Sequence, residues 1–286
     1  QTISPQNGSD GGSVSITSTS GNILVNGNVT TTGGIGQNLD NGSNGGNGGD
    51  GTNGGAGGLV SITTNSGSIK TTNIFTDAGA GGNGGNVLTS VNTAGKGGNG
   101  GSAGIVNLNT NSGDIETADI STRGGKGGNG GAGGDSRDFR NPNGGAGGNS
   151  GNRGNGSLVN LTANSGNVKT TNISTTAGVA GIVGIVGSGY GFSTPPGRPG
   201  TPGSPGTNGS SGDVIITTGR DLIFSSINAG TDTFYFSNEL PTNQGGNVNL
   251  NSNGTVRGTG AIPSYSTLIT RTTISTATTQ PGSITI

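Results

Sequence analysis

The sequence contains no cysteine, methionine, histidine or tryptophan, and charged and aromatic residues make up only 9% and 3% of it. Without cysteine and histidine, cysteine nucleophiles, imidazole acid–base catalysis and thiolate or imidazole metal sites are excluded. The 12 basic and 13 acidic residues include no basic run, so nothing predicts nucleic-acid binding. No apolar run approaches the ~20 residues that span a bilayer. We therefore expect no enzyme, no cofactor, no nucleic-acid partner and no membrane span.

Glycine dominates instead, with 67 of the 286 residues, while hydrophobic residues reach only 25%. A typical domain is about 45–50% apolar when glycine is counted, so a wide core cannot be built here. Disordered chains of low hydrophobicity usually carry many charges, and this chain carries few. Its apolar residues are mostly β-branched and regularly placed, which predicts a thin core repeated along an axis.

An internal repeat carries these apolar residues. Segments 58–76, 104–122 and 157–175 align without gaps, and looser copies run over 12–31, 212–229 and 246–262. Each copy begins with alternating apolar and polar residues, turns at an Asn-Ser-Gly corner in the three close copies, and continues with two shorter apolar positions. Three short strands with one apolar face each predict an all-β fold, a parallel β-helix (solenoid) in which each copy is one coil.

Stacking of the coils should place equivalent residues over one another. The residues expected in the core are Val60, Ile62, Ile69, Ile74, Val106, Leu108, Ile115, Ile120, Val159, Leu161, Val168 and Ile173. The corner residues Asn65, Asn111 and Asn164 are expected to form an amide ladder along the axis. A second file could form from Asn73, Asp119 and Asn172, and Lys70, Glu116 and Lys169 should alternate in charge at one equivalent site.

Glycine-rich insertions separate the copies, at about 33–58, 78–86, 94–104, 124–156 and 178–212. Glycine recurs in them at every third position, which matches the three residues per turn of a polyproline II helix. A flexible linker has no reason to keep such a period. Several insertions leave the repeat after its third strand, so we expect them to lie side by side as a polyglycine-II-like bundle. Mobile surface loops are the alternative that the sequence leaves open.

Three local groups of polar residues could suggest a binding or catalytic site, and we interpret each as structural. Gly45-Gly-Asn-Gly-Gly-Asp50 resembles the start of a calcium-binding nonapeptide, but Thr52 stands where that motif needs an apolar residue. Arg137-Asp138-Phe139-Arg140 is interpreted as an ordinary loop tip. The carboxylates within segment 104–122 are expected to point outward singly rather than as a catalytic pair.

Segments 60–69 and 159–168 resemble the repeats of filamentous-haemagglutinin-type exoproteins, most of all cyanobacterial members with Gly/Asn-rich insertions. The resemblance implies a right-handed, single-stranded β-helix, export by two-partner secretion, and a role as an adhesin or surface fibre. The periodic glycines are similar to those of the polyglycine-II bundles of phage tail-fibre tips and small antifreeze proteins.

Residues 1–286 are therefore expected to form one continuous solenoid fragment of a secreted, extracellular or cell-surface protein. The final segment, 281–286, looks like the opening of another copy, so we expect the protein to continue. We expect a structural, filament-forming protein that self-associates. An adhesin that binds a receptor or glycan through exposed loops, and an ice-binding protein, are the alternatives.

Overall fold

The structure is a computed structural model that describes residues 5–42, 46–88, 92–137, 143–191, 196–230, 245–258 and 284–285. Gly45 of the calcium-like motif lies outside these residues, as do Asp138, Phe139 and Arg140 of the charged loop tip. Most of the segment that resembles a further copy, 281–283 and 286, also lies outside them.

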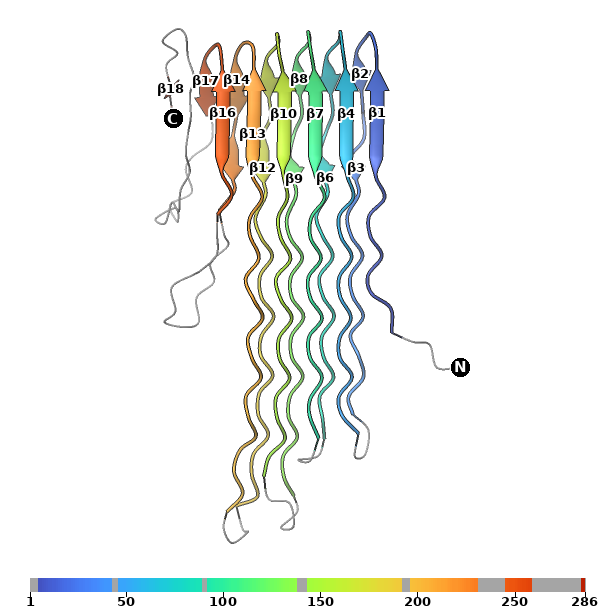
Figure 1. Cartoon of the computed structure of the whole chain (residues 1–286), viewed down its shortest axis with the longest axis vertical. Helices are drawn as coiled ribbons and strands as arrows, with labels where there is room; N and C mark the ends of the chain where they lie inside the picture. Colours follow the sequence, from blue (N-terminus) through green and yellow to red (C-terminus); the bar gives the residue numbers. More distant parts are fainter. Residues whose placement is uncertain are drawn as a thin grey trace.

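The described strands form three parallel sheets, and successive strands of a sheet come from successive coils (Figure 1). The first sheet contains β1 (Val14–Ser18), β4 (Val60–Thr64), β7 (Val106–Thr110), β10 (Val159–Ala163), β13 (Val214–Thr218) and β16 (Val248–Ser252). The second contains β2 (Ile23–Leu24), β5 (Ile69–Lys70), β8 (Ile115–Glu116), β11 (Val168–Lys169), β14 (Leu222–Phe224), β17 (Val256–Gly258) and β18 (Ile284–Thr285). The third contains β3 (Val29–Thr30), β6 (Ile74–Phe75), β9 (Ile120–Ser121), β12 (Asn172–Ser174) and β15 (Ser226–Asn228).

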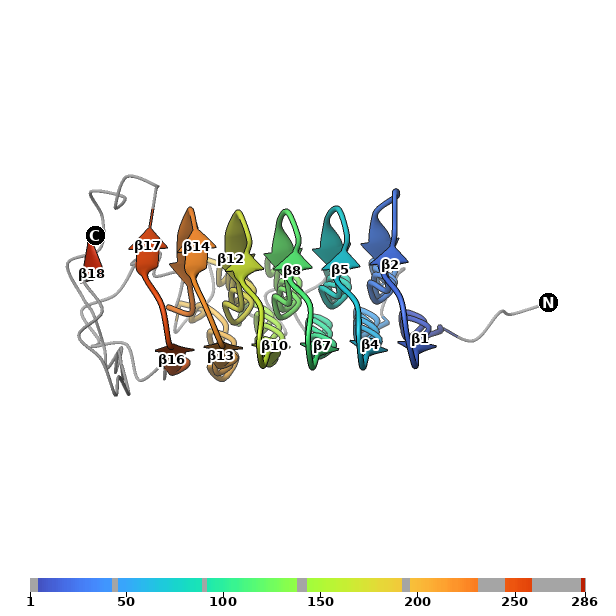
Figure 2. The ribbon, with the colours of Figure 1, turned by 90° about the horizontal axis from the view of Figure 1, so that it is seen from above.

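The pairing register places each residue beside its equivalent in the next copy. Val60 pairs with Val106, which pairs with Val159, and Ile115 lies between Ile69 and Val168. Seen from above, the coils are stacked face to face along one axis (Figure 2). The described residues contain no helix. The predicted all-β, parallel β-solenoid is confirmed.

The core is a set of narrow apolar files inside the coils. The twelve residues expected there, from Val60 to Ile173, are all at most 1% exposed. Burying a side chain of this size contributes roughly 1.5–3 kcal/mol, so each coil gains several such contributions only by stacking on its neighbours. Val14 and Ile16, on β1 at one end of the stack, are only partly buried.

The glycine-rich insertions extend far from the coils as pairs of wavy chains that lie side by side (Figure 1). We number the described segments as tracts 1–9, with residues 5–13, 31–42, 46–59, 76–88, 92–105, 122–137, 143–158, 175–191 and 196–213. Even-numbered tracts leave a coil after its third strand, and odd-numbered tracts lead into the next coil. The insertions expected at 78–86 and 94–104 are the two halves of one such pair, tracts 4 and 5. Together the nine tracts form the glycine bundle.

Candidate functional site: the glycine bundle and its polar files

Two layers make up the glycine bundle, one of even tracts and one of odd tracts, and a file of backbone hydrogen bonds joins them. The amide of Gly79 donates to the carbonyl of Gly55 at 2.9 Å, and the amide of Gly101 donates to Gly79 at 3.0 Å. The same file continues through Gly125, which donates to Gly101 at 3.0 Å. We call residues of this kind, which recur at every third position, the cross-layer positions. Each tract is therefore bonded to the tract before it in the chain.

The residue before each cross-layer position bonds within a layer. The amide of Gly81 in tract 4 donates to the carbonyl of Lys126 in tract 6 at 2.8 Å, and Gly127 donates to Val179 in tract 8 at 2.9 Å. In the odd layer, Gly51 donates to Lys96 at 2.8 Å. We call these the in-layer positions. They join equivalent tracts of successive coils, as the strand ladders do in the solenoid.

The third residue of each turn occupies the outer position, and Asn or Asp side chains accept its amide hydrogen. The amide of Asn129 donates to Asn83 Oδ1 at 2.8 Å, and the amide of Asn99 donates to Asn53 Oδ1 at 2.8 Å. In every such contact the accepting side chain belongs to the preceding tract of the same layer. Where the cap is present, all three amides of a turn are hydrogen-bonded. Sequence reasoning missed these caps, although Asn recurs in step with the glycines.

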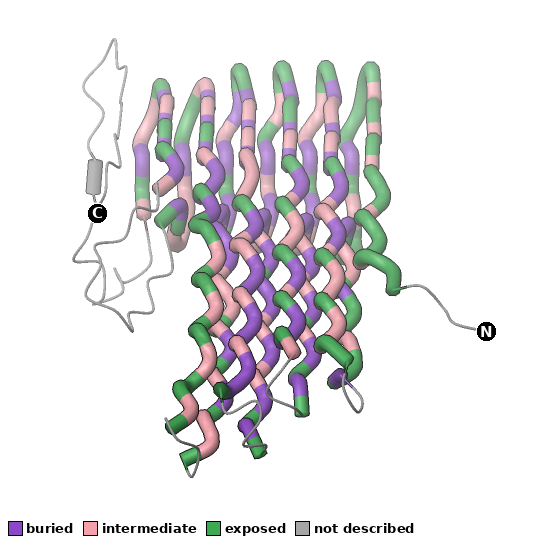
Figure 3. The backbone as a smooth tube through the Cα atoms, turned by 60° about the horizontal axis from the view of Figure 1, so that its bottom comes forward, coloured by how far each residue is buried: buried purple, intermediate pink, exposed green. Residues whose placement is uncertain are grey.

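Glycine is required where two tracts approach closely. A Cβ at Gly125, a cross-layer position, would lie 1.9 Å from the carbonyl oxygen of Gly79. A Cβ at Gly124, an in-layer position, would lie 2.1 Å from the carbonyl oxygen of Gly154. Both obstacles are backbone atoms, so no side-chain movement relieves the contact. Buried residues recur along the tracts while exposed residues lie outward, which is the pattern that Figure 3 shows.

A file of buried threonines closes the neck between the solenoid and the glycine bundle. Each Oγ1 donates to a backbone carbonyl at the end of the tract that returns to the next coil. The four bonds join Thr31 to Gly58 at 2.9 Å, Thr76 to Gly104 at 2.8 Å, Thr122 to Ser157 at 2.8 Å and Thr175 to Gly212 at 2.6 Å. Sequence reasoning also missed this role, because threonine is a common strand residue in its own right.

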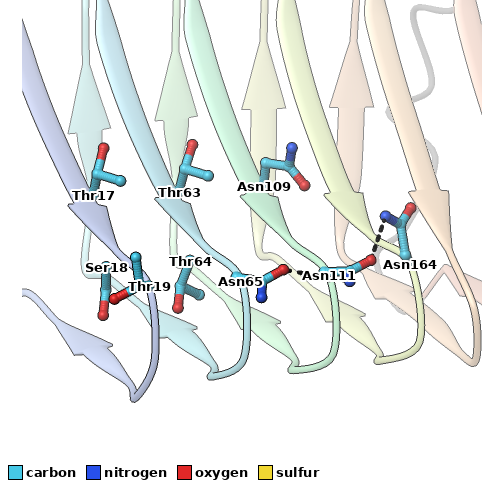
Figure 4. A pocket seen from close by; sticks show the side chains of 9 residues that line it. All are labelled: Thr17, Ser18, Thr19, Thr63, Thr64, Asn65, Asn109, Asn111 and Asn164. Carbon is cyan, nitrogen blue, oxygen red and sulfur yellow. Dashed lines mark hydrogen bonds between the residues drawn. The ribbon is translucent and has the colours of Figure 1, made fainter.

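Asn65, Asn111 and Asn164 lie in one file at the first corner (Figure 4). Asn111 Nδ2 donates to Asn65 Oδ1 at 3.5 Å, and Asn164 Nδ2 donates to Asn111 Oδ1 at 3.1 Å. At the second expected file, Asn172 Nδ2 donates to Asp119 Oδ1 at 2.9 Å, and the Asp119 amide donates to Asn73 Oδ1 at 3.1 Å. In both files the hydrogen bonds run along the stacking axis, between side chains at the first corner and partly through a backbone amide in the second file.

The corner Asn file borders an open depression of about 350 Å³. The residues that line it are Thr17, Ser18, Thr19, Thr63, Thr64, Asn65, Asn109, Asn111 and Asn164. All nine are neutral, so this surface offers hydroxyl and amide hydrogen bonds but no proton donor or acceptor for acid–base chemistry.

Glu116 lies between two lysines of the neighbouring coils. Its carboxylate is 2.8 Å from Lys70 Nζ and 3.3 Å from Lys169 Nζ. Hydrogen bonds from Lys70 and then Lys169 lower the pKa of Glu116 below its usual value. The side chain is 41% exposed, so solvent screens both pairs and each contributes roughly 0–1 kcal/mol.

Arg153 interrupts the glycine pattern at an in-layer position of tract 7. Its Nε is buried without a hydrogen-bond partner, and burial lowers the pKa of its guanidinium. Elsewhere, the described residues contain no cluster of acidic side chains that could hold a metal ion. Within that same part of the chain, no helix is long and apolar enough to cross a membrane.

No protein-family model and no curated protein matches this chain. A solved structure that does match is the nine polyproline type II helical bundle springtail antifreeze protein from Granisotoma rainieri. The identity is 21% over 73% of this chain and 98% of that chain, with a TM-score of 0.16. At that score the match carries no argument about the fold or function of this protein.

Proposed function

We propose that this chain is part of an extracellular structural filament or surface fibre built by stacking β-solenoid coils. The observation that carries the proposal is the incomplete burial at β1. Val14 and Ile16 are half-buried, whereas their equivalents Val60 and Ile62 are fully buried between two coils. Among the described strands, β1 pairs on one side only. A further coil, from a longer chain or a second copy, would bury these residues and pair this edge.

The same proposal accounts for the polar surface. A low-charge surface of Asn, Ser and Thr on repeated coils provides no reactive group, but it suits a long, evenly hydrated fibre. We interpret the glycine tracts as polyglycine-II-type helices, and the three-residue period of their hydrogen bonds supports this interpretation. Such a bundle would stiffen the fibre along one side.

Electron microscopy of the concentrated chain tests the proposal. We expect fibres whose axial repeat is the coil spacing of about 4.8 Å or a multiple of it. Ile16→Lys places a charge in the apolar file and should abolish the fibres, while Thr17→Lys on the outer face of the same strand should preserve them. A wild-type chain that stays monomeric at every concentration would overturn the proposal, and so would fibres that tolerate Ile16→Lys.

Ice binding is a second candidate, and the regular array of outer positions favours it. Successive odd tracts place Asn7, Asn53, Asn99, Asn152 and Thr207 in one file, each bonded to the next through an Asn cap. Similar files repeat every three residues along the tracts, so the polar groups lie on a fixed lattice that could order water. Thermal hysteresis in a freezing assay is the expected result, and its absence would remove this candidate. The adhesin alternative depends on tip loops, and residues 138–142 and 192–195 lie outside the described residues.

A further inference from the structure

Tracts 8 and 9 lie at the edge of the glycine bundle that is farther along the chain (Figure 1). At this edge the in-layer positions change character. In tract 9 three successive in-layer positions are Pro199, Pro202 and Pro205, which are exposed and lack an amide hydrogen, and Asn208 and Ser211 follow toward the coil. The equivalent residues of tract 7, Gly144 and Gly147 among them, donate to tract 9. Tract 9 accepts hydrogen bonds on one side and has no in-layer donor at these prolines on the other.

The even layer changes at the same level. Tract 8 has Ala180, Val183 and Val186 at its in-layer positions, where tract 6 has only glycine. A Cβ at Gly130 of tract 6 would lie 2.0 Å from the carbonyl oxygen of Gly148 in tract 7. The equivalent Val183 therefore faces tract 9, which already lies there. A Cβ at Gly147 of tract 7 would lie 2.2 Å from the carbonyl oxygen of Gly184 in tract 8, so the equivalent Pro202 would collide with an even tract packed beyond tract 9 in the same geometry.

The amide caps are also missing at this edge. Apart from Asp213 at the neck, the outer positions of tracts 8 and 9 contain no Asn or Asp; they are Thr176, Val179, Ile182, Ile185 and Ser188, then Arg198, Thr201, Ser204, Thr207 and Ser210. Asp213 is the one acidic residue at an outer position of these two tracts. Asp213, where tract 9 enters its coil, accepts from the amide of Asn247 at 2.7 Å, and there the next coil is present. Caps therefore occur where a following segment lies and stop where none is described.

We propose that tracts 8 and 9 form a built-in terminus of the glycine bundle, closed to any further glycine tract of this chain or of a second copy. Three effects act together: proline removes the in-layer donors, the proline rings occupy the approach of the next tract, and the acceptors for incoming amides are absent. Among the described residues, only solenoid coils stack beyond this edge. The inference is independent of the proposed function, because it concerns which tracts can pack together and not whether coils of different chains associate.

A grafted tract pair tests the closure. Residues 231–244, which contain no glycine, are replaced by a copy of residues 124–155, which keeps the repeat in register. The graft is placed in the wild-type chain and in an open-edge variant carrying Pro199→Gly, Pro202→Gly and Pro205→Gly. A matched control has the same number of glycines at outer positions of the same tract: Thr201→Gly, Ser204→Gly and Thr207→Gly. All three carry Ile16→Lys, so that stacking of copies through β1 does not interfere.

Amide hydrogen exchange of the graft is the readout. We expect at least tenfold slower exchange in the open-edge variant than in the wild-type or control background. Protection of the graft in the wild-type or control background would overturn the proposal, and so would equally fast exchange in all three.

A reciprocal variant covers the case in which the open-edge chain fails to fold. Gly144→Pro with Gly147→Pro transfers the stop to tract 7. Exchange should then rise at least tenfold in the outer half of tracts 8 and 9 while Gly79 and Gly101 stay protected. Unchanged exchange in tracts 8 and 9 would overturn the proposal.

Discussion

Replacing Gly125 by alanine tests the close packing of the glycine bundle. The new Cβ would lie 1.9 Å from the carbonyl oxygen of Gly79, whereas ordinary contact begins at 3.4 Å, so the tracts must separate by 1.5 Å (3.4 − 1.9). The bond from Gly125 to Gly101, at 3.0 Å, and the bond from Gly154 to Gly125, at 2.9 Å, would not survive that movement. Each buried bond left unmade costs about 1–3 kcal/mol, or about 2–6 kcal/mol for both. Alanine returns about 0.4–1 kcal/mol by restricting the unfolded chain. We therefore expect the free energy of unfolding to fall by about 1–6 kcal/mol.

Gly27→Ala is the matched control. No atom lies within 4 Å of a Cβ at Gly27, which is exposed at a coil corner. Only the unfolded-chain effect remains, so this variant should be about 0.4–1 kcal/mol more stable than the wild type. Urea unfolding followed by circular dichroism compares the three chains, with hydrogen exchange at Gly79 and Gly101 as the local readout. Equal stabilisation by both substitutions would refute the close packing of the tracts.

Further substitutions test other parts of the structure. Ile115→Ala leaves a cavity between Ile69 and Val168 and should lower the free energy of unfolding by about 2–5 kcal/mol. The control Ser61→Ala, on the outer face of the coil, should change that free energy by less than about 0.5 kcal/mol. Arg153→Gly removes a buried Nε that has no hydrogen-bond partner and restores the glycine found at the equivalent Gly100. We expect urea unfolding to show stabilisation by about 0.5–2 kcal/mol. A loss of stability would contradict the conclusion that the buried Arg153 Nε is destabilising. Folding lowers the pKa of Glu116 from its ordinary 4.5. Its contribution to the stability of the fold is therefore present above pH 4.5 and disappears as the pH falls through the lower folded-state pKa. Glu116→Gln should remove this acid-sensitive contribution to the free energy of unfolding, roughly 0–1 kcal/mol for each lysine pair. If the difference in stability between wild type and variant grew as the pH was lowered, that result would count against the two ion pairs.

The sequence predicted the solenoid because alternation and corner residues constrain each coil separately. Ile69, Ile115 and Val168 occupy equivalent places in three copies, and only stacking can bury all three. The same logic located the corner file of Asn65, Asn111 and Asn164 and the alternating charges around Glu116.

The glycine period predicted close packing of the tracts but not which tracts would be partners. A three-residue repeat is the same whether a glycine such as Gly125 bonds across the layers or, like Gly124, within one. The caps escaped notice because Asn is also common in turns, so Asn83 and Asn53 had an adequate local explanation. The neck hydrogen bond of Thr76 was not predicted for a similar reason, because threonine is also a common strand residue. These roles depend on contacts between residues about one coil apart, and a single copy does not reveal them.

Residue-resolved amide exchange along tract 6 tests the central claim most directly, because the structure assigns each amide its own partner. The amide of Gly127 donates within the layer, that of Gly128 donates across the layers, and that of Asn129 donates to Asn83 Oδ1. Lys126 lies opposite Ala80, whose side chain cannot accept its amide hydrogen. The account predicts slow exchange at the first three amides and fast exchange at Lys126. Uniformly fast exchange from Gly124 to Gly134 would mean that the tracts are independent loops, and the account would be wrong.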